Sequence, residues 1–152
     1  MLKKFFGLFQ PIKMEDAFFG PLLLMKATHP HLSYWEGGRK FEPLNQRAEV
    51  FIDTLSEKVG PSEAQRGFFR RIEEEYRLIC LIIEDRFRTD PWVEHVMKGR
   101  FDEEFKLGSF SIPLCHQSNE EWSASFDSAS DPEHILTVTF DGMEARNISV
   151  NG

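Results

Sequence analysis

SEAQRGFFRRIEEEYRLICLIIEDRFR, residues 62–88, is the stretch of this chain with the clearest helical repeat. Its apolar side chains recur at steps of three and four, at Phe69, Ile72, Tyr76, Ile79, Ile83 and Phe87, with Phe68 and Cys80 beside them. This spacing gathers them on one side of an α-helix, where they can face a core. At about 1.5 Å per residue the helix would be roughly 40 Å long, enough to cross a whole sheet. We therefore predict one long helix over 62–88.

The start and the outer face of this helix are also marked in the sequence. Ser62 follows the Gly60-Pro61 break and can act as the N-cap, and Gln65 stands where it can complete a capping box. Oppositely charged residues four apart, such as Arg70 and Glu74, indicate a solvent-exposed face. Three apolar residues lie outside the main stripe, namely Leu78, Leu81 and Ile82. We expect them to be covered, so that the middle of the helix is buried on more than one side.

Short segments before the helix alternate in polarity as β-strands do. Residues 14–20 are interpreted as a connector and residues 22–26 as a short buried strand. Residues 33–41 are expected to form a hairpin that turns at Gly37-Gly38. Residues 47–54 alternate cleanly and are predicted to be the last strand before the helix.

The residues after the helix predict a short second helix and then a four-stranded meander. Asp90-Pro91 marks the start of a helix over about 91–98. The apolar residues of 105–114 change parity at Gly108, which indicates a β-bulge. Further strands are predicted at 121–127, 135–140 and 144–150, with an Asp141-Gly142 turn and with 144–150 at a sheet edge.

This order of elements defines the expected fold class. Strands joined by hairpins run antiparallel, so we predict an α+β fold built on a mainly antiparallel sheet of about six to seven strands. The long helix packs on one face of that sheet. A chain of 152 residues with no internal repeat or linker is expected to form a single domain, residues 1–152.

The N-terminus and the cysteines bear on location. Residues 1–13 predict a short helix or arm, because the apolar run before Gln10 is shorter than a signal-peptide core. Its phenylalanines either close over the core or form a foot for a membrane or a partner. Cys80 and Cys115 form no CxxC pair, which favours a reducing compartment. We expect a cytoplasmic protein without an integral membrane segment.

Signatures of the best-known catalytic and cofactor sites are missing from the sequence. It contains no GxGxxG, GxxxxGK[ST], GxSxG or HExxH motif. His29 and His31 form an HxH pair, but Pro30 between them indicates a loop, and spacing places no third ligand. Cys115 and His116 are adjacent, so on a strand they would point to opposite faces. We predict neither a metal nor a cofactor.

One group of titratable residues has a pattern that suits acid-base chemistry. Asp131, Glu133 and His134 gather where a loop enters a strand, and a carboxylate there could assist the histidine in proton transfer. A solvated turn explains the same three residues without chemistry. If they do act together, we expect a small hydrolase or ligand-binding domain with a pocket walled by Trp35 or Trp122.

The charge of the chain is distributed unevenly. Residues 1–117 hold 17 Lys and Arg against 18 Asp and Glu, whereas residues 118–152 hold one Arg against seven acidic residues. The seven are Glu120, Glu121, Asp127, Asp131, Glu133, Asp141 and Glu144. They flank strands and turns, so we expect them to gather along one rim. Such a rim would repel nucleic acid and attract a basic protein, although an acidic solubility surface has the same composition.

Three stretches of the chain carry a resemblance to a known type of protein. They are Tyr34-Trp35-Glu36-Gly37, the helix opening Pro61-Ser62-Glu63-x-Gln65-Arg66, and residues 133–142, EHILTVTFDG. Together they resemble a family of small, uncharacterised bacterial α+β proteins, over residues 17–152. Some relatives of that type resemble immunity proteins for secreted toxins. The resemblance implies a partner-binding role and carries over no catalytic residue.

These observations lead to one hypothesis and two alternatives. The hypothesis is a non-enzymatic protein-binding module, similar to immunity proteins, that meets a basic partner through its acidic C-terminal strands. The residues expected to bind the partner are Glu121, Asp127, Asp131, Glu133, His134, Glu144 and Trp35. The first alternative is the small hydrolase or ligand-binding domain built on His134. The second is a homodimer that pairs through the edge strand 144–150.

Overall fold

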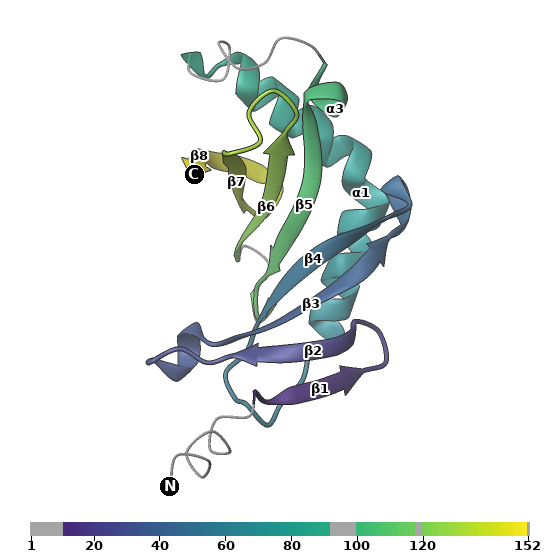
Figure 1. Ribbon diagram of the computed structural model, residues 1–152, viewed down its shortest axis with the longest axis vertical. Coiled ribbons are helices and arrows are strands. Elements are labelled where there is room, and N and C mark those ends of the chain that lie inside the picture. Colours follow the sequence, from purple (N-terminus) through teal and green to yellow (C-terminus); the bar gives the residue numbers. More distant parts are fainter. Residues whose placement is uncertain (1–10, 92–99, 118–119, 152) are drawn as a thin grey trace, which may run out of the picture.

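A computed structural model describes residues 11–91, 100–117 and 120–151 of the chain (Figure 1). The strands before the helix are β1 (Lys13–Asp16), β2 (Gly20–Met25), β3 (Tyr34–Phe41) and β4 (Gln46–Asp53), with short 3-10 turns η1 (Pro30–Leu32) and η2 (Glu42–Leu44). The helices are α1 (Glu63–Arg88) and α3 (Phe101–Glu104). The strands after them are β5 (Phe105–Ile112), β6 (Glu121–Ser128), β7 (Ile135–Asp141) and β8 (Glu144–Asn151).

All eight strands form one sheet whose spatial order is the order of the sequence, β1 to β8. Neighbouring strands are antiparallel except β4 and β5, which are parallel because α1 carries the chain back between them. The predicted α+β class is therefore confirmed, with one long helix and a mostly antiparallel sheet. Strand directions rotate steadily across the sheet in Figure 1, so that it twists around α1.

The strand count is eight, not the six to seven predicted, and two segments before the helix differ from the prediction. Residues 14–16 were interpreted as part of a connector, yet Lys13–Asp16 pair with β2 as the short edge strand β1. The expected hairpin at Gly37-Gly38 is also wrong, because β3 runs unbroken through both glycines. A Cβ at Gly37 would lie 2.5 Å from Leu22 Cδ2, so this glycine serves close packing of β3 on β2. The real turn follows at η2, where Asn45 has a φ of 49°.

The long helix begins as the sequence predicts. Ser62 is the N-cap: its side chain accepts a hydrogen bond from the Gln65 backbone N–H (3.1 Å), and the Gln65 side chain accepts one from the Ser62 N–H (3.0 Å). Gln65 is buried, and its Nε2 also donates to the carbonyl oxygens of Asp53 and Pro113, each at 2.9 Å. One side chain thus joins the start of α1 to the ends of the two parallel strands.

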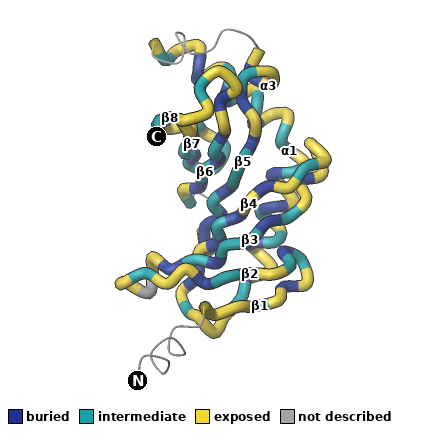
Figure 2. The backbone as a smooth tube through the Cα atoms, in the orientation of Figure 1, coloured by how far each residue is buried: buried dark blue, intermediate teal, exposed yellow. Residues whose placement is uncertain are grey.

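The core lies between α1 and the face of the sheet that it covers. The helix stripe is buried at Phe69, Ile72, Ile79, Ile83 and Phe87. Phe69 packs edge-on against Phe41 of β3 and Phe110 of β5, and Phe87 packs against Phe101 and Phe105. Buried positions alternate along the central strands in Figure 2, as a sheet with one covered face requires. Each large apolar side chain buried in this way contributes about 1.5–3 kcal/mol.

The other face of the sheet carries hydroxyl side chains. The Oγ atoms of Ser111 and Ser123 lie 2.8 Å apart, and Ser125 Oγ lies 2.9 Å from Thr137 Oγ1. These cross-strand pairs satisfy each other and leave a polar surface. No described element covers it, so the molecule has two layers.

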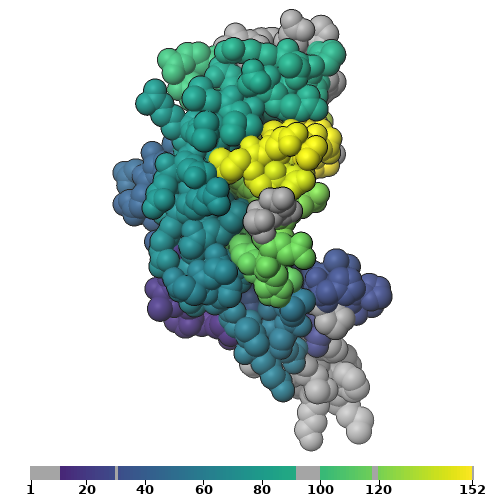
Figure 3. All heavy atoms as spheres, turned by 180° about the vertical axis from the view of Figure 1, so that it is seen from behind, coloured from purple at the N-terminus to yellow at the C-terminus, as the bar shows by residue number. Residues whose placement is uncertain are grey.

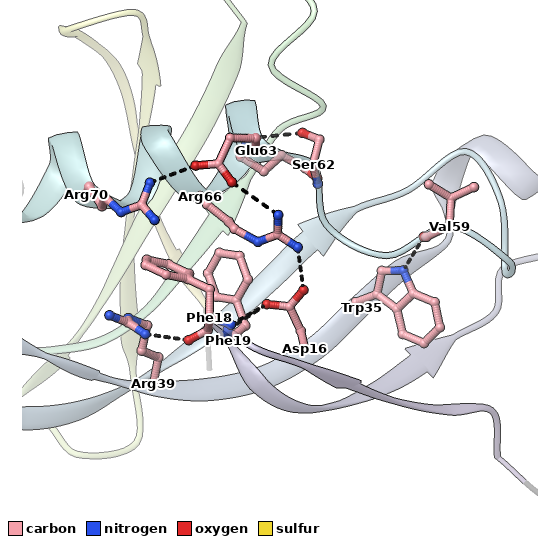
Figure 4. A network of polar contacts seen from close by, with 11 residues as sticks. Asp16, Phe18, Phe19, Trp35, Arg39, Val59, Ser62, Glu63, Arg66 and Arg70 are labelled. Carbon is pink, nitrogen blue, oxygen red and sulfur yellow. Dashed lines mark hydrogen bonds and ion pairs between the residues drawn. The ribbon is translucent and has the colours of Figure 1, made fainter.

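A network of charges fixes the β1–β2 turn to α1 (Figure 4). The Asp16 carboxylate accepts hydrogen bonds from the backbone N–H groups of Phe18 (2.9 Å) and Phe19 (2.8 Å). It also pairs with Arg66 of α1 at 2.7 Å. Arg66 in turn pairs with Glu63 at 3.2 Å, and Glu63 with Arg70 at 3.0 Å. The Asp16 side chain is 5% exposed, which makes it the buried member of the network.

Several further predictions can be compared with the structure. The bulge at Gly108, the Asp141-Gly142 turn and the edge position of β8 are confirmed. Leu78 and Leu81 are 51% and 55% exposed, so the expectation that they are covered is wrong. Nearly all of the short helix predicted for 91–98, and most of the arm at 1–13, lies outside the described residues. No helix in the described ranges is long and apolar enough to cross a membrane.

Candidate functional site

A groove beside α1 has a volume of about 540 Å³, and a smaller cavity of about 380 Å³ is lined by residues that include Arg47, Ser109 and Asp127. The apolar walls of the groove are Phe68, Ile72 and Ile79 from the helix, Trp122 from β6 and Met143 from the β7–β8 turn. Its polar lining consists of Arg71, Glu75, Cys115, Gln117 and Glu120. Figure 3 shows this side of the molecule, where α1, β8 and the connection between β5 and β6 lie together. The size and the mixed lining are typical of small-ligand sites.

Aromatic packing makes one wall of the groove rigid. The Trp122 indole N–H donates to the Gly142 carbonyl oxygen at 2.6 Å, which ties β6 to the β7–β8 turn. The ring stacks on Phe140 with centroids 4.3 Å apart, and Phe68 of α1 meets it edge-on at 5.5 Å. Trp122 is therefore held from three sides. It was predicted to wall a pocket that contains His134, but the groove that it lines includes neither His134 nor Asp131 nor Glu133.

The helix wall of the groove contains a glycine. Gly67 lies within α1, is exposed, and lines the groove. A Cβ built on it would meet no atom within 4 Å. Glycine inside a helix costs about 1 kcal/mol relative to alanine, and no packing contact within the described chain requires it here.

The opposite wall is a short loop held by one carboxylate. Glu120 accepts hydrogen bonds from the backbone N–H of Cys115 (2.8 Å) and of Gln117 (2.7 Å). Cys115 has a φ of 60°, a left-handed conformation that is unfavourable for a residue with a side chain. Burial, and then the negative charges of Glu120 and Asp53, raise the pKa of the Cys115 thiol to about 11. The thiol is therefore protonated near neutral pH and is a poor nucleophile.

The acidic C-terminal residues do not form the single rim that was expected. Glu121 and Asp127 stand at opposite ends of β6, six residues and so about 20 Å apart. Glu121 pairs in register with Asp141, near Glu144, beside the groove. Asp127 lies with the β6–β7 loop at the other end. The sequence could not separate these groups, because the distance between them depends on strand direction.

The group at the Asp127 end is joined by the short helix α3. The Glu104 carboxylate accepts hydrogen bonds from Ser128 Oγ (2.9 Å) and from the backbone N–H of Ser130 (3.1 Å). This places the β6–β7 loop against α3. We call the resulting surface the acidic end; it consists of Asp102, Glu103, Glu104, Asp127, Asp131 and Glu133.

Two residues predicted to act together are in contact at the acidic end. His134 Nδ1 and Asp131 Oδ2 are 2.6 Å apart, although both side chains are more than 40% exposed. Neither lines the two described cavities. Trp35 is fully buried and donates its indole N–H to the Val59 carbonyl at 3.1 Å (Figure 4), so its side chain offers no surface to a partner.

The histidine pair considered for a metal lies elsewhere. His29 precedes η1 and His31 lies within it, and their rings stack with centroids 5.5 Å apart. Within residues 11–91, 100–117 and 120–151, no group of three or more His, Cys, Asp or Glu side chains is arranged to hold a metal ion.

The fold and the groove together define a two-layer α+β protein with a binding-type cavity. No protein-family model matches the chain. Neither the curated proteins nor the solved structures give a significant match. The particular function must therefore be inferred from the residues themselves.

Proposed function

We propose that this chain is a non-catalytic protein-binding module that holds a basic segment of a partner protein at its acidic end. The surplus of carboxylates there supports the proposal. Of its six acidic residues, Asp102 pairs with Arg100 at 3.0 Å and Asp131 with His134, whereas Glu103, Asp127 and Glu133 have no ion-pair partner among the described residues.

The carboxylates of α1 are a useful contrast. The helix holds six carboxylates and six arginines, and Glu63, Glu75 and Glu84 each pair with an arginine of the same helix. A helix whose charges balance in this way has little net field to offer a partner. Unpaired charges of one sign attract the opposite charge and speed association at low ionic strength. The acidic end therefore suits lysine- and arginine-rich segments, and it disfavours nucleic acid.

The contact between His134 and Asp131 keeps a hydrolytic role as a second candidate. It is the weaker one because the pair stands in a solvent-exposed turn, outside both described cavities. Pairing of two copies through β8 remains a prediction, since β8 is a sheet edge.

Capture from lysate of the source organism tests the proposal at low and high salt, about 0.05 and 0.5 M, because salt screens exposed charges. The same capture is made with the variant Asp127→Lys/Asp131→Lys/Glu133→Lys, which reverses three charges at the acidic end. We expect the wild-type chain to retain a basic protein at low salt, more weakly at high salt, and the variant to retain at least tenfold less.

A matched control separates the effect of charge at the acidic end from the effect of the net charge of the whole chain. Glu15→Lys/Glu57→Lys/Glu74→Lys reverses three exposed carboxylates outside the acidic end and should retain the partner as the wild type does. Circular dichroism must show that both variants are folded. The proposal is contradicted if the wild type and the acidic-end variant retain the partner equally, or if retention is the same at low and high salt.

A further inference from the structure

We propose that the groove between α1 and the β5–β6 connection is a binding site for a small amphiphile with an apolar body and a positively charged head. This site is separate from the acidic end. Glu121, which lies next to the groove residues Glu120 and Trp122, is about 20 Å along β6 from Asp127. Four properties of the groove support the proposal.

The first property is the volume of the groove and the chemical character of its walls. A volume of about 540 Å³ is within the range of ligand sites, and the floor is apolar. The half-buried Phe68 offers an aromatic surface. The buried side chains of Trp122, Ile72 and Ile79 form the apolar wall behind it. Aromatic faces also attract cations, so this lining favours an apolar body next to a positive group.

The second property is the presence of Gly67 in the helix wall of the groove. A glycine inside a helix lowers stability, and here the space above it is empty. Alanine would fit in the free protein without contact. The feature that glycine alone provides is room for another molecule to approach the helix backbone closely. A ligand in the groove would use that room.

The third is the strained loop on the opposite wall. Cys115 is one of two described non-glycine residues with positive φ, and Glu120 holds it in place through two backbone N–H groups. Strained backbone of this kind is maintained where surrounding structure fixes it, and it is enriched at ligand sites. Gly67 and Cys115 come from different elements, yet both line the same groove.

The fourth property is the net charge of the residues in and beside the groove. The lining holds one cation, Arg71, which pairs with Glu75 at 3.3 Å, and a second carboxylate, Glu120. Beyond the lining, Arg146 stands between Asp141 and Glu144 near the same opening. Acidic residues therefore outnumber basic ones both in the lining and beside the opening. The groove therefore favours a cationic head over an anionic one.

Three probes of equal chain length test which head-group charge the groove prefers: decylamine and decanoate, each below its micelle concentration, and decanol below its solubility limit. Binding is followed by the NMR signal of the Trp122 indole N–H, which lies in the groove wall. We expect decylamine to bind at least tenfold more tightly than decanoate, with decanol between them. Equal affinity for decylamine and decanoate, or no binding of any probe, overturns the proposal.

Two pairs of variants locate the site. Gly67→Leu fills the groove and should weaken decylamine binding at least tenfold, whereas Gly67→Ala should raise the midpoint of thermal unfolding. Glu75→Gln frees Arg71 and should shift preference toward decanoate, whereas Glu74→Gln, an exposed neighbour that does not line the groove, should change nothing. Wild-type affinity for decylamine in a folded Gly67→Leu variant overturns the assignment, and so does an unchanged preference in Glu75→Gln.

Discussion

Asp16 is the residue on which the attachment of β1 to the helix depends most. Burial alone would raise the pKa of its carboxyl, but hydrogen bonds from Arg66 and from the Phe19 and Phe18 N–H groups, with the Arg66 charge, hold that pKa below its ordinary value. A carboxyl with a depressed pKa in the folded state adds stability above its unfolded pKa of about 4. That stability is lost as the pH falls through the folded pKa.

We therefore expect Asp16→Asn to lower the free energy of unfolding at pH 7 by about 1–3 kcal/mol, because two backbone donors and Arg66 lose a charged acceptor. The penalty should begin to shrink below about pH 4, where the unfolded chain takes up a proton at this carboxyl, and should shrink further as the pH falls toward the lower pKa of the folded state. Urea unfolding at pH 7 and at about pH 3 measures both values. An equal penalty at the two pH values would show that the charge of Asp16 is not the cause.

The glycines show how far a single residue predicts local structure from the sequence. Gly37-Gly38 is a common turn signal, but here the pair lets β3 pass close to Leu22 and the Arg47 side chain. Gly108 was correctly associated with a bulge because the apolar residues around it change parity. The difference is physical: parity records which face is buried, whereas a glycine by itself records only that a side chain would not fit or is not needed.

The start of α1 is the element whose stability the structure explains most directly. Ser62→Ala removes a cap and should cost about 1 kcal/mol. Gln65→Ala should cost more, about 2–4 kcal/mol, because it also leaves the buried carbonyl of Pro113 and the partly buried carbonyl of Asp53 without their donor. Urea unfolding of both variants gives the comparison. Equal losses would show that Gln65 acts only as a cap and does not join the parallel strands.

Elements with a clear period were predictable, and those defined by distant contacts were not. The helix and the strands β5, β6 and β7 follow from apolar spacing, since burial on one face imposes that spacing, whereas β8 was indicated by the Asp141-Gly142 turn before it. The exposure of Leu78 and Leu81 could not be deduced, because it depends on which elements reach the helix. The groove was missed for the same reason: Cys115 and Gly67 are far apart in sequence. Gly67 inside a helical pattern was the one available signal.

At the scale of the whole molecule, α1 and the parallel β4–β5 pair join two four-stranded halves. The core is continuous across this junction, since Phe41 of the first half packs against Phe110 of the second at 5.1 Å. The sequence could indicate two sets of strands but not their parallel contact, which follows from the return of the chain through α1.

We therefore expect both halves to unfold in one transition. Trp35 reports on the first half and Trp122 on the second, so each can serve as the only tryptophan in a chain with the other two replaced by Phe. In urea, the fluorescence of each variant should coincide with its own far-ultraviolet circular dichroism, which is the test of a two-state transition. A continuous core makes partial unfolding costly, because either half alone would expose the face that α1 covers. If the Trp122 reporter changes at lower urea than the dichroism while the Trp35 reporter does not, then β5–β8 unfolds independently. In that case the groove, which depends on Trp122 and Met143, would open before the rest of the fold.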